Sequence, residues 1–141
     1  MRADVIGVDS HDPGDYCVIL RVEDDRAVAV PVEARHAQSI RLGLDNTRFG
    51  RPLTHDLLIE VLTEMGGAVD SAEIYAYDEE RDEFYARLKT ESYRGGDRRD
   101  EIPYDCDPGD AVGVALKSSA PIRVSEDVVE EAPAPESETG W

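Results

Sequence analysis

Cysteine, tryptophan, lysine and long apolar runs are all scarce in this sequence of 141 residues. No run of about 18 consecutive apolar residues occurs, so we expect no helix that spans a membrane. The two cysteines, Cys17 and Cys106, form no C-x-x-C pair, and we expect free, buried thiols in a reducing compartment. The G-x-S-x-G, P-loop and G-x-G-x-x-G motifs and zinc-ligand spacings are also missing, which leaves serine hydrolases and the usual nucleotide-binding loops without support.

Negative charge is what the sequence has in excess. It contains 32 acidic residues against 15 Lys and Arg, a net charge of −17, and its lysines are Lys89 and Lys117 alone. Repulsion of this size opposes a compact state in dilute buffer, whereas molar salt shortens the Debye length to about 3 Å and screens it. This composition is typical of a halophilic cell, the alternative being an acidic protein of an ordinary one. Residues 1–14 lack a signal-peptide pattern, so we expect a cytoplasmic protein.

Hydrophobic periodicity predicts one α+β domain with a mixed sheet and about three helices. β-branched runs separated by acidic turns indicate strands joined as hairpins, and apolar residues at helical spacing indicate amphipathic helices. The predicted strands span residues 3–8, 15–22, 26–32, 68–77, 83–89, 101–104 and 121–124, and the predicted helices span 33–44, 54–65, 107–118 and, as one terminal turn, 125–129.

The predicted domain covers residues 1–129 and is followed by a disordered acidic tail, 130–141, that ends in Trp141. Within the domain, strand, turn, strand and helix follow one another twice, in residues 15–44 and 83–118. This order predicts an internal ββα duplication, with a weak residue match between the two copies.

Two of the predicted helices begin with a histidine beside an acidic residue. Glu33 and His36 lie on one side of the first helix start, where they could share a metal ion, although a solvated helix start explains them equally well. His55 and Asp56 follow Thr54 at the next start. They could bind a metal or transfer protons, or Thr54 and Asp56 could simply stabilise the helix end while His55 lies at its edge.

Three aspartates gather where a predicted strand meets the third predicted helix. Asp105, Asp107 and Asp110 could hold Mg²⁺ or Mn²⁺ and orient a phosphodiester. The same segment also has the pattern of a helix start, with Asp107 as the N-cap and Pro108 at the first position. We therefore interpret Asp110 as structural, whereas Asp105 is less well explained by the helix start.

Several segments resemble the bifunctional nuclease domain family. Residues 51–58, RPLTHDLL, are similar to its R-P-x-T-H-D-L-L signature, and residues 105–111, DCDPGDA, are similar to its D-A-R-P-S-D-A segment. The resemblance runs in order from about residue 15 to 128. Its further segments are VPV at 30–32, AQSI at 37–40, FYARL at 84–88 and API at 120–122.

The resemblance implies cleavage of DNA and RNA, with two departures. His36 stands where the family has Glu, and Asp107 stands where it has Arg, which removes a guanidinium suited to phosphate. Phosphate binding through counterion release also weakens as salt rises. Nuclease action by so acidic a chain should therefore need Mg²⁺ or Mn²⁺ to bridge its acids to DNA or RNA.

The resemblance to this family, taken with the candidate residues, implies a metal-assisted nuclease. His55 would be a base or ligand, Asp56 and Asp105 would be catalytic metal ligands, and Glu33 and His36 would be further metal ligands. The alternative is a non-catalytic regulatory or protein-binding module, and the sequence leaves open whether the chain forms a homodimer. Convergence of His55, Asp56 and Asp105 around one cleft would favour the nuclease.

Overall fold

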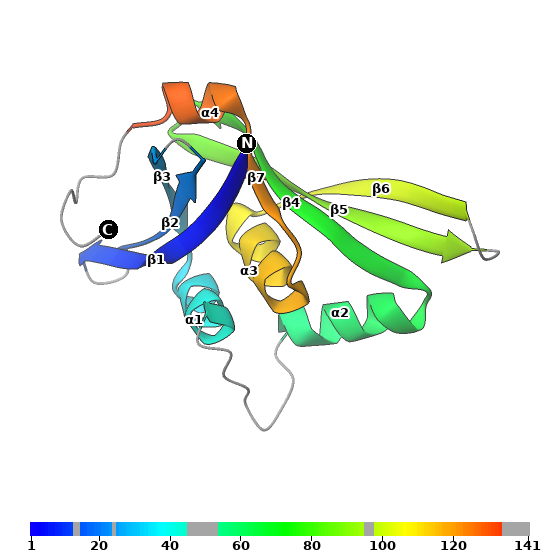
Figure 1. Cartoon of the computed structure of the whole chain (residues 1–141). Coiled ribbons are helices and arrows are strands. Elements are labelled where there is room, and N and C mark those ends of the chain that lie inside the picture. Colours follow the sequence, from blue (N-terminus) through cyan, green and yellow to red (C-terminus); the bar gives the residue numbers. More distant parts are fainter. Residues whose placement is uncertain (13–14, 24, 45–53, 95–97, 134–141) are drawn as a thin grey trace.

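The described part of the chain, residues 1–12, 15–23, 25–44, 54–94 and 98–133, builds a curled seven-stranded mixed sheet and four helices in this computed structural model (Figure 1). This architecture confirms the predicted α+β class, and the fourth helix is the expected terminal turn. The strands are β1 (Arg2–Asp12), β2 (Asp15–Val22), β3 (Ala27–Val32), β4 (Gly67–Asp78), β5 (Glu83–Arg94), β6 (Arg98–Cys106) and β7 (Ile122–Val124), and the helices are α1 (Ala34–Leu44), α2 (Thr54–Glu64), α3 (Pro108–Ser118) and α4 (Glu126–Glu131).

The short strand β7 lies in the middle of the sheet, whose order is β3-β2-β1-β7-β4-β5-β6. It pairs parallel to β4 and antiparallel to β1, and the other neighbours pair antiparallel. Register shifts interrupt the β1–β2 and β4–β5 ladders. Because a bulge bends its strand and increases the local twist, these irregularities help the long strands to curl.

The sheet has two similar halves, one on each side of β7. Strands β1–β3 lead into α1, and strands β4–β6 lead into α3, so each unit has one strand more than the predicted ββα repeat. His36 and Asp110 occupy the third position of α1 and of α3, respectively. Gly109 lies against His36 and Gly43 lies against Leu116. The two helices therefore run in the same direction and begin at the same end.

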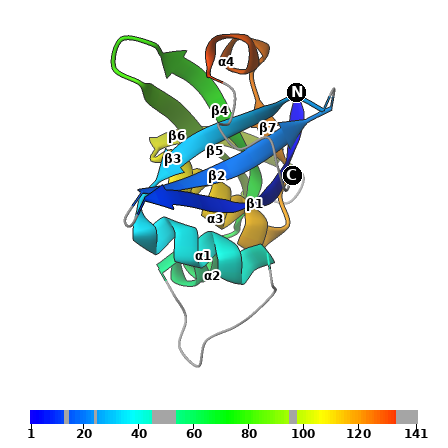
Figure 2. The ribbon, with the colours of Figure 1, turned by 90° about the vertical axis from the view of Figure 1, so that its left-hand side faces the viewer.

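Helix α3 is the central element of the core. Its alanines and valines from Ala111 to Ala115 are buried, and they share one apolar cluster with strand residues, with Ile40 of α1 and with Val128 of α4. Helices α1, α2 and α3 lie on the same side of the sheet in both views (Figures 1 and 2). This arrangement brings the first turns of three helices close together.

Helix α2 forms where the sequence predicts it, but most of its apolar residues are not in the core. Leu57 is 55% exposed and Met65, just beyond the helix end, is 80% exposed. The one buried residue of α2 is His55. The helix makes its close approach to α3 through that ring, which leaves the leucines farther along outside the central cluster.

The local helix signals in the sequence correspond to observed contacts. Asp107 caps α3 by accepting a hydrogen bond from the Gly109 amide at 2.8 Å, and Ser125 caps α4. Gly66 follows α2 with a φ of 85°, a conformation that glycine adopts without steric cost.

The remaining expectations concern the tail, the cysteines and the membrane. Helix α4 includes the first two residues of the expected tail, whereas residues 134–141, with Trp141, lie outside the described residues. Cys17 and Cys106 are half-buried, and they form no disulfide within the described residues. Within the described residues, none of the helices is long and apolar enough to cross a membrane.

Candidate metal centre at three helix starts

His36, His55 and Asp110 meet at the first turns of α1, α2 and α3. One donor atom from each residue lies within 4.8 Å of the other two. Both histidines are buried, whereas the Asp110 side chain is 42% exposed. The cluster is therefore reached from solvent on its carboxylate side.

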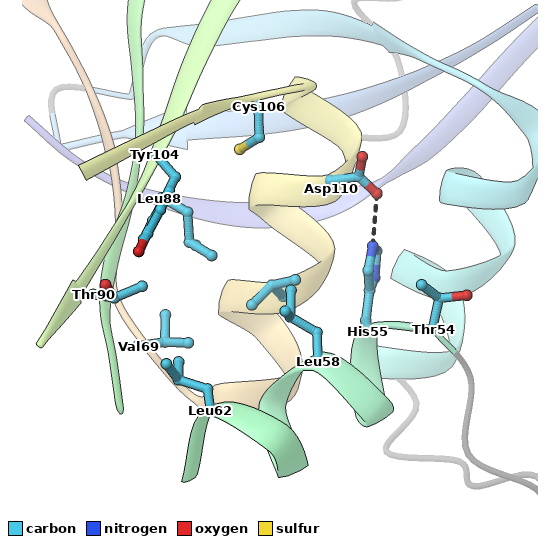
Figure 3. A pocket seen from close by; sticks show the side chains of 11 residues that line it. Thr54, His55, Leu58, Leu62, Val69, Leu88, Thr90, Tyr104, Cys106 and Asp110 are labelled. Atoms are coloured by element: carbon cyan, nitrogen blue, oxygen red, sulfur yellow. Dashed lines mark hydrogen bonds and ion pairs between the residues drawn. The ribbon is translucent and has the colours of Figure 1, made fainter. Parts of the chain in front are cut away.

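A single oxygen atom joins the two imidazoles. Asp110 Oδ1 lies 2.8 Å from His55 Nε2, the contact drawn in Figure 3, and 2.9 Å from His36 Nε2. The rings are stacked, with centroids 6.2 Å apart and planes at 14°. The two side chains thus present the same type of nitrogen to the same point.

Two glycines of α3 make room for these rings. A Cβ atom at Gly109 would lie 2.3 Å from His36 Nδ1, and one at Gly113 would lie 2.6 Å from His55 Cε1. Carbon atoms do not approach ring atoms so closely, so any side chain at these positions would displace the imidazoles. Because residues four apart lie on the same face of a helix, α3 offers one glycine to each histidine.

Ser39 orients the His55 ring from behind. Its hydroxyl lies 3.1 Å from His55 Nδ1, on the ring edge opposite Asp110. A hydroxyl can donate or accept, so this bond is compatible with two tautomers. When Nε2 carries the proton, it donates to Asp110; when Nδ1 carries it, Nδ1 donates to Ser39 and Nε2 presents a free lone pair.

His36 is the unsatisfied member of the cluster. Its Nε2 is close to Asp110, but the carboxylate lies off the direction of a hydrogen bond, and Nδ1 is 3.6 Å from Asp107. Neither ring nitrogen forms a hydrogen bond with any described residue. Because a buried polar atom without a partner is costly, the cluster fits an additional ligand, and two imidazoles with one carboxylate are a known donor set for a divalent metal.

The histidines also influence the ionisation of Asp110. Burial alone would raise the pKa of this carboxyl, but the hydrogen bond from His55 and the charges of His36, His55 and Arg35 lower the pKa below its ordinary value. Asp110 is therefore ionised near neutral pH, as a metal ligand must be.

The grouping of His55 with Asp56 and Asp105 is not the one that the structure shows. Asp56 accepts from Lys117 at 3.1 Å, and Asp105 accepts from the Tyr75 hydroxyl at 3.0 Å on the exposed surface of β6. Glu33 forms an ion pair with Arg35 at 2.8 Å and is not part of the cluster that His36 forms with His55 and Asp110. Asp110, which the sequence led us to interpret as structural, lies between the two rings: Asp107 caps the helix, and the Asp110 carboxylate contacts both imidazoles.

Sequence reasoning missed Ser39, Asp110, Gly109 and Gly113 as parts of one centre. The spacing of the glycines was a usable signal, because two glycines four residues apart in a predicted helix indicate close approach on one face. The convergence itself was not readable, since no local spacing links residues from three helices.

A cavity of about 470 Å³ opens beside this centre. His55 and Asp110 line one end, and side chains of α2, of α3 and of strands β4–β6 line the rest (Figure 3). Burial, followed by the nearby aspartates, raises the pKa of the Cys106 thiol in its wall to about 11. This thiol is therefore neutral and serves as wall rather than as a nucleophile.

A comparison with known families identifies the chain. Residues 18–137 match the model of the bifunctional nuclease domain. The chain belongs to this family. The predicted family is thereby confirmed, and two of the segments that resemble it, 51–58 and 105–111, supply His55 and Asp110 to the cluster.

Individual relatives of this family are distant in sequence. The chain is 29% identical over 112 residues to Bifunctional nuclease 1 of Oryza sativa subsp. indica and 24% identical over 110 residues to Bifunctional nuclease 2 of Arabidopsis thaliana. These matches cover 78% and 77% of this chain but 33% and 32% of the plant proteins, so it spans about a third of their length. An uncharacterized protein of Mycobacterium tuberculosis H37Rv is 28% identical over 130 residues, which cover 91% of this chain and 73% of that protein.

Proposed function

We propose that this chain hydrolyses phosphodiester bonds of nucleic acids with a divalent metal held by His36, His55 and Asp110. The observation that carries the proposal is the meeting of His55 and Asp110, one from each of two family-like segments, with His36 at one cluster of metal-ligand type. Membership of a family whose plant relatives are named nucleases supports it.

The donor set favours Zn²⁺, with Mn²⁺ as the second candidate, over Mg²⁺. Imidazole nitrogen suits zinc and the later transition metals, whereas magnesium prefers oxygen ligands in octahedral geometry. Two histidines and one carboxylate are also the protein ligands of a known type of catalytic zinc site, which leaves a fourth position open. The exposed side of Asp110 would give water and substrate access to a metal held there.

The reaction adds water to phosphorus and breaks the bond to one sugar oxygen, which takes up a proton by way of solvent. When bound, the metal ion polarises a phosphoryl oxygen and lowers the pKa of a water molecule. His36 and His55 present Nε2 lone pairs, and Ser39 fixes the His55 tautomer by accepting from Nδ1. A hydrogen-bond partner behind a histidine ligand typically sets its orientation in this way.

Arg35 is the proposed phosphate contact. It lies beside His36 in α1, its side chain is largely exposed, and its positive charge acts on Asp110 and Asp107. A guanidinium offers a fork that matches two phosphate oxygens. Arg35 could therefore replace the arginine that the family has at position 107.

A cleavage assay in molar KCl tests the proposal. Single-stranded DNA and RNA are incubated with the protein and Zn²⁺, Mn²⁺ or Mg²⁺, each with and without EDTA. We expect cleavage with Zn²⁺ or Mn²⁺, weaker cleavage with Mg²⁺, and none with EDTA. Cleavage that survives EDTA would refute the metal-dependent mechanism.

The exposed apolar face of α2 favours a second candidate, a non-catalytic protein-binding module. Leu57 and Val61 lie on one side of this helix and, like Met65 just beyond its end, are exposed to solvent. Exposed apolar surface of this kind often marks an interaction site. If the folded protein cleaves neither nucleic acid with any of the three metals, this candidate replaces the nuclease.

A further inference from the structure

The cavity beside the metal centre has apolar walls on two opposite sides. Leu58 and Leu62 lie on the same face of α2 as His55, three and seven residues farther along. Leu88 of β5 and Tyr104 of β6 are cross-strand partners, so they project to the same face of the sheet and form the opposite wall (Figure 3). The space between them is closed at one end by the Asp110–His55 pair.

Tyr104 contributes an aromatic ring to this wall, and the ring is accessible to solvent. Its side chain lines the cavity, yet the residue is 54% exposed. An accessible ring above an aliphatic floor is the arrangement on which planar bases stack. The volume of about 470 Å³ falls within the ordinary range of small-molecule sites, roughly 300–1,000 Å³.

The charge of the chain requires a source of affinity other than phosphate contacts. With a net charge of −17, the protein repels a polyanion at low salt, and at high salt counterion release contributes little to binding. Stacking and apolar burial are uncharged interactions and persist in salt. We therefore expect a nucleic acid to bind this chain largely through contacts to its bases.

We propose that this cavity receives one unpaired nucleobase, stacked on Tyr104, whose own phosphodiester lies at the Asp110 end. The inference rests on the proposed nuclease function and names its substrate class, single-stranded or locally unpaired DNA and RNA. A base in a duplex would first have to leave its stack. Since stacking tolerates every base, cleavage has little sequence preference.

Calorimetric titration in molar KCl with EDTA separates base binding from cleavage. The probes are a single-stranded DNA hexamer, the same hexamer without bases, and a duplex of the same sequence. We expect the base-bearing strand to bind about tenfold or more tightly than either of the others. Equal binding by the abasic strand, or no binding of the base-bearing strand at millimolar concentration, would overturn the proposal.

Tyrosine variants locate the base. Tyr104→Ala should weaken hexamer binding by about tenfold, and Tyr104→Phe, which keeps the ring, should bind like the wild type. Tyr93→Ala is the matched control, because Tyr93 is also an exposed strand tyrosine but lies outside the cavity wall. If Tyr104→Ala and Tyr93→Ala bind alike, the pocket assignment is wrong.

The two proposals can fail separately. Tyr104-dependent binding without metal-dependent cleavage would leave the base pocket in place and remove the nuclease. Cleavage of duplex and single strand at equal rates, unaffected by Tyr104→Ala, would leave the nuclease in place and remove the base pocket.

Discussion

Asp110 Oδ1 is the atom on which the geometry of the centre depends, because both histidines contact it and neither ring is exposed. In the absence of metal, one of the two imidazoles, His55, is hydrogen-bonded to this oxygen, and in its presence both could act with the carboxylate as a donor set. Because the two ring nitrogens of His36 have no hydrogen-bond partner among the described residues, a bound metal would satisfy this side chain better than the metal-free arrangement does.

The first prediction concerns stabilisation by metal. Zinc at about a hundred times its dissociation constant should raise the free energy of unfolding by about 2.7 kcal/mol, because it binds the folded state alone. His36→Ala and Asp110→Asn should lose this gain, which thermal melts with ZnCl₂ and with EDTA would measure. Asp105→Asn is the control and should keep it. A zinc-induced shift that both Asp variants share would place the ion elsewhere.

At the level of helices, the centre depends on how closely α3 approaches α1 and α2. The prediction compares Gly113→Ala with Gly43→Ala. A Cβ at Gly43 would lie 3.4 Å from Leu116 Cβ, so this substitution should be neutral or stabilise by up to about 1 kcal/mol through helix propensity.

Gly113→Ala gains the same propensity but forces His55 to move. We expect it to reduce metal-dependent cleavage by more than tenfold, even where urea unfolding shows a stability close to that of Gly43→Ala, since small misplacements of reacting groups are costly. Equal activity of the two variants would show that the ring position is not critical.

The elements were predictable because their signals are local. Alternating β-branched residues identified both hairpins, and the acidic and proline residues at 107–108 identified the start of α3. What each helix face packs against, in contrast, depends on residues far away in the sequence. The leucines of α2 have the same spacing whether they meet a core or a cavity, so their exposure could not be read from periodicity.

The site was predictable only in part, for the same reason. His36 and His55 stood out as histidines at helix starts, but Asp110 already had a sufficient local explanation as part of a helix start. In the structure His36 and Asp110 occupy equivalent positions of α1 and α3, but the residue match of the internal repeat is too weak to show this from the sequence.

On the scale of the whole molecule, the excess negative charge should make folding depend on salt. The melting temperature should rise markedly between about 0.1 M and molar KCl, as the Debye length falls from about 10 to 3 Å and screens the carboxylates. Circular dichroism melts across this range would measure it. A flat or falling curve would contradict the halophilic interpretation.

The same charge determines how the molecule can act on a polyanion. A nuclease with this composition would need a cation at its centre and an uncharged binding surface nearby. Under the two proposals, the cluster of His36, His55 and Asp110 and the apolar cavity beside it would supply these. An assay at low salt without added metal would detect neither metal-dependent cleavage nor binding through the bases.

The most direct test of the centre compares two carboxylates of one short segment. Asp110→Asn and Asp105→Asn make the same chemical change five residues apart, and cleavage of single-stranded DNA is measured in molar KCl with Zn²⁺ or Mn²⁺. We predict that Asp110→Asn loses at least about a hundredfold in activity, because losing even a hydrogen-bond partner behind a metal ligand costs roughly 10–100-fold. Asp105→Asn, whose oxygen still accepts from Tyr75, should cleave at the wild-type rate. The opposite order, or equal rates for both variants, would contradict a metal centre at His36, His55 and Asp110.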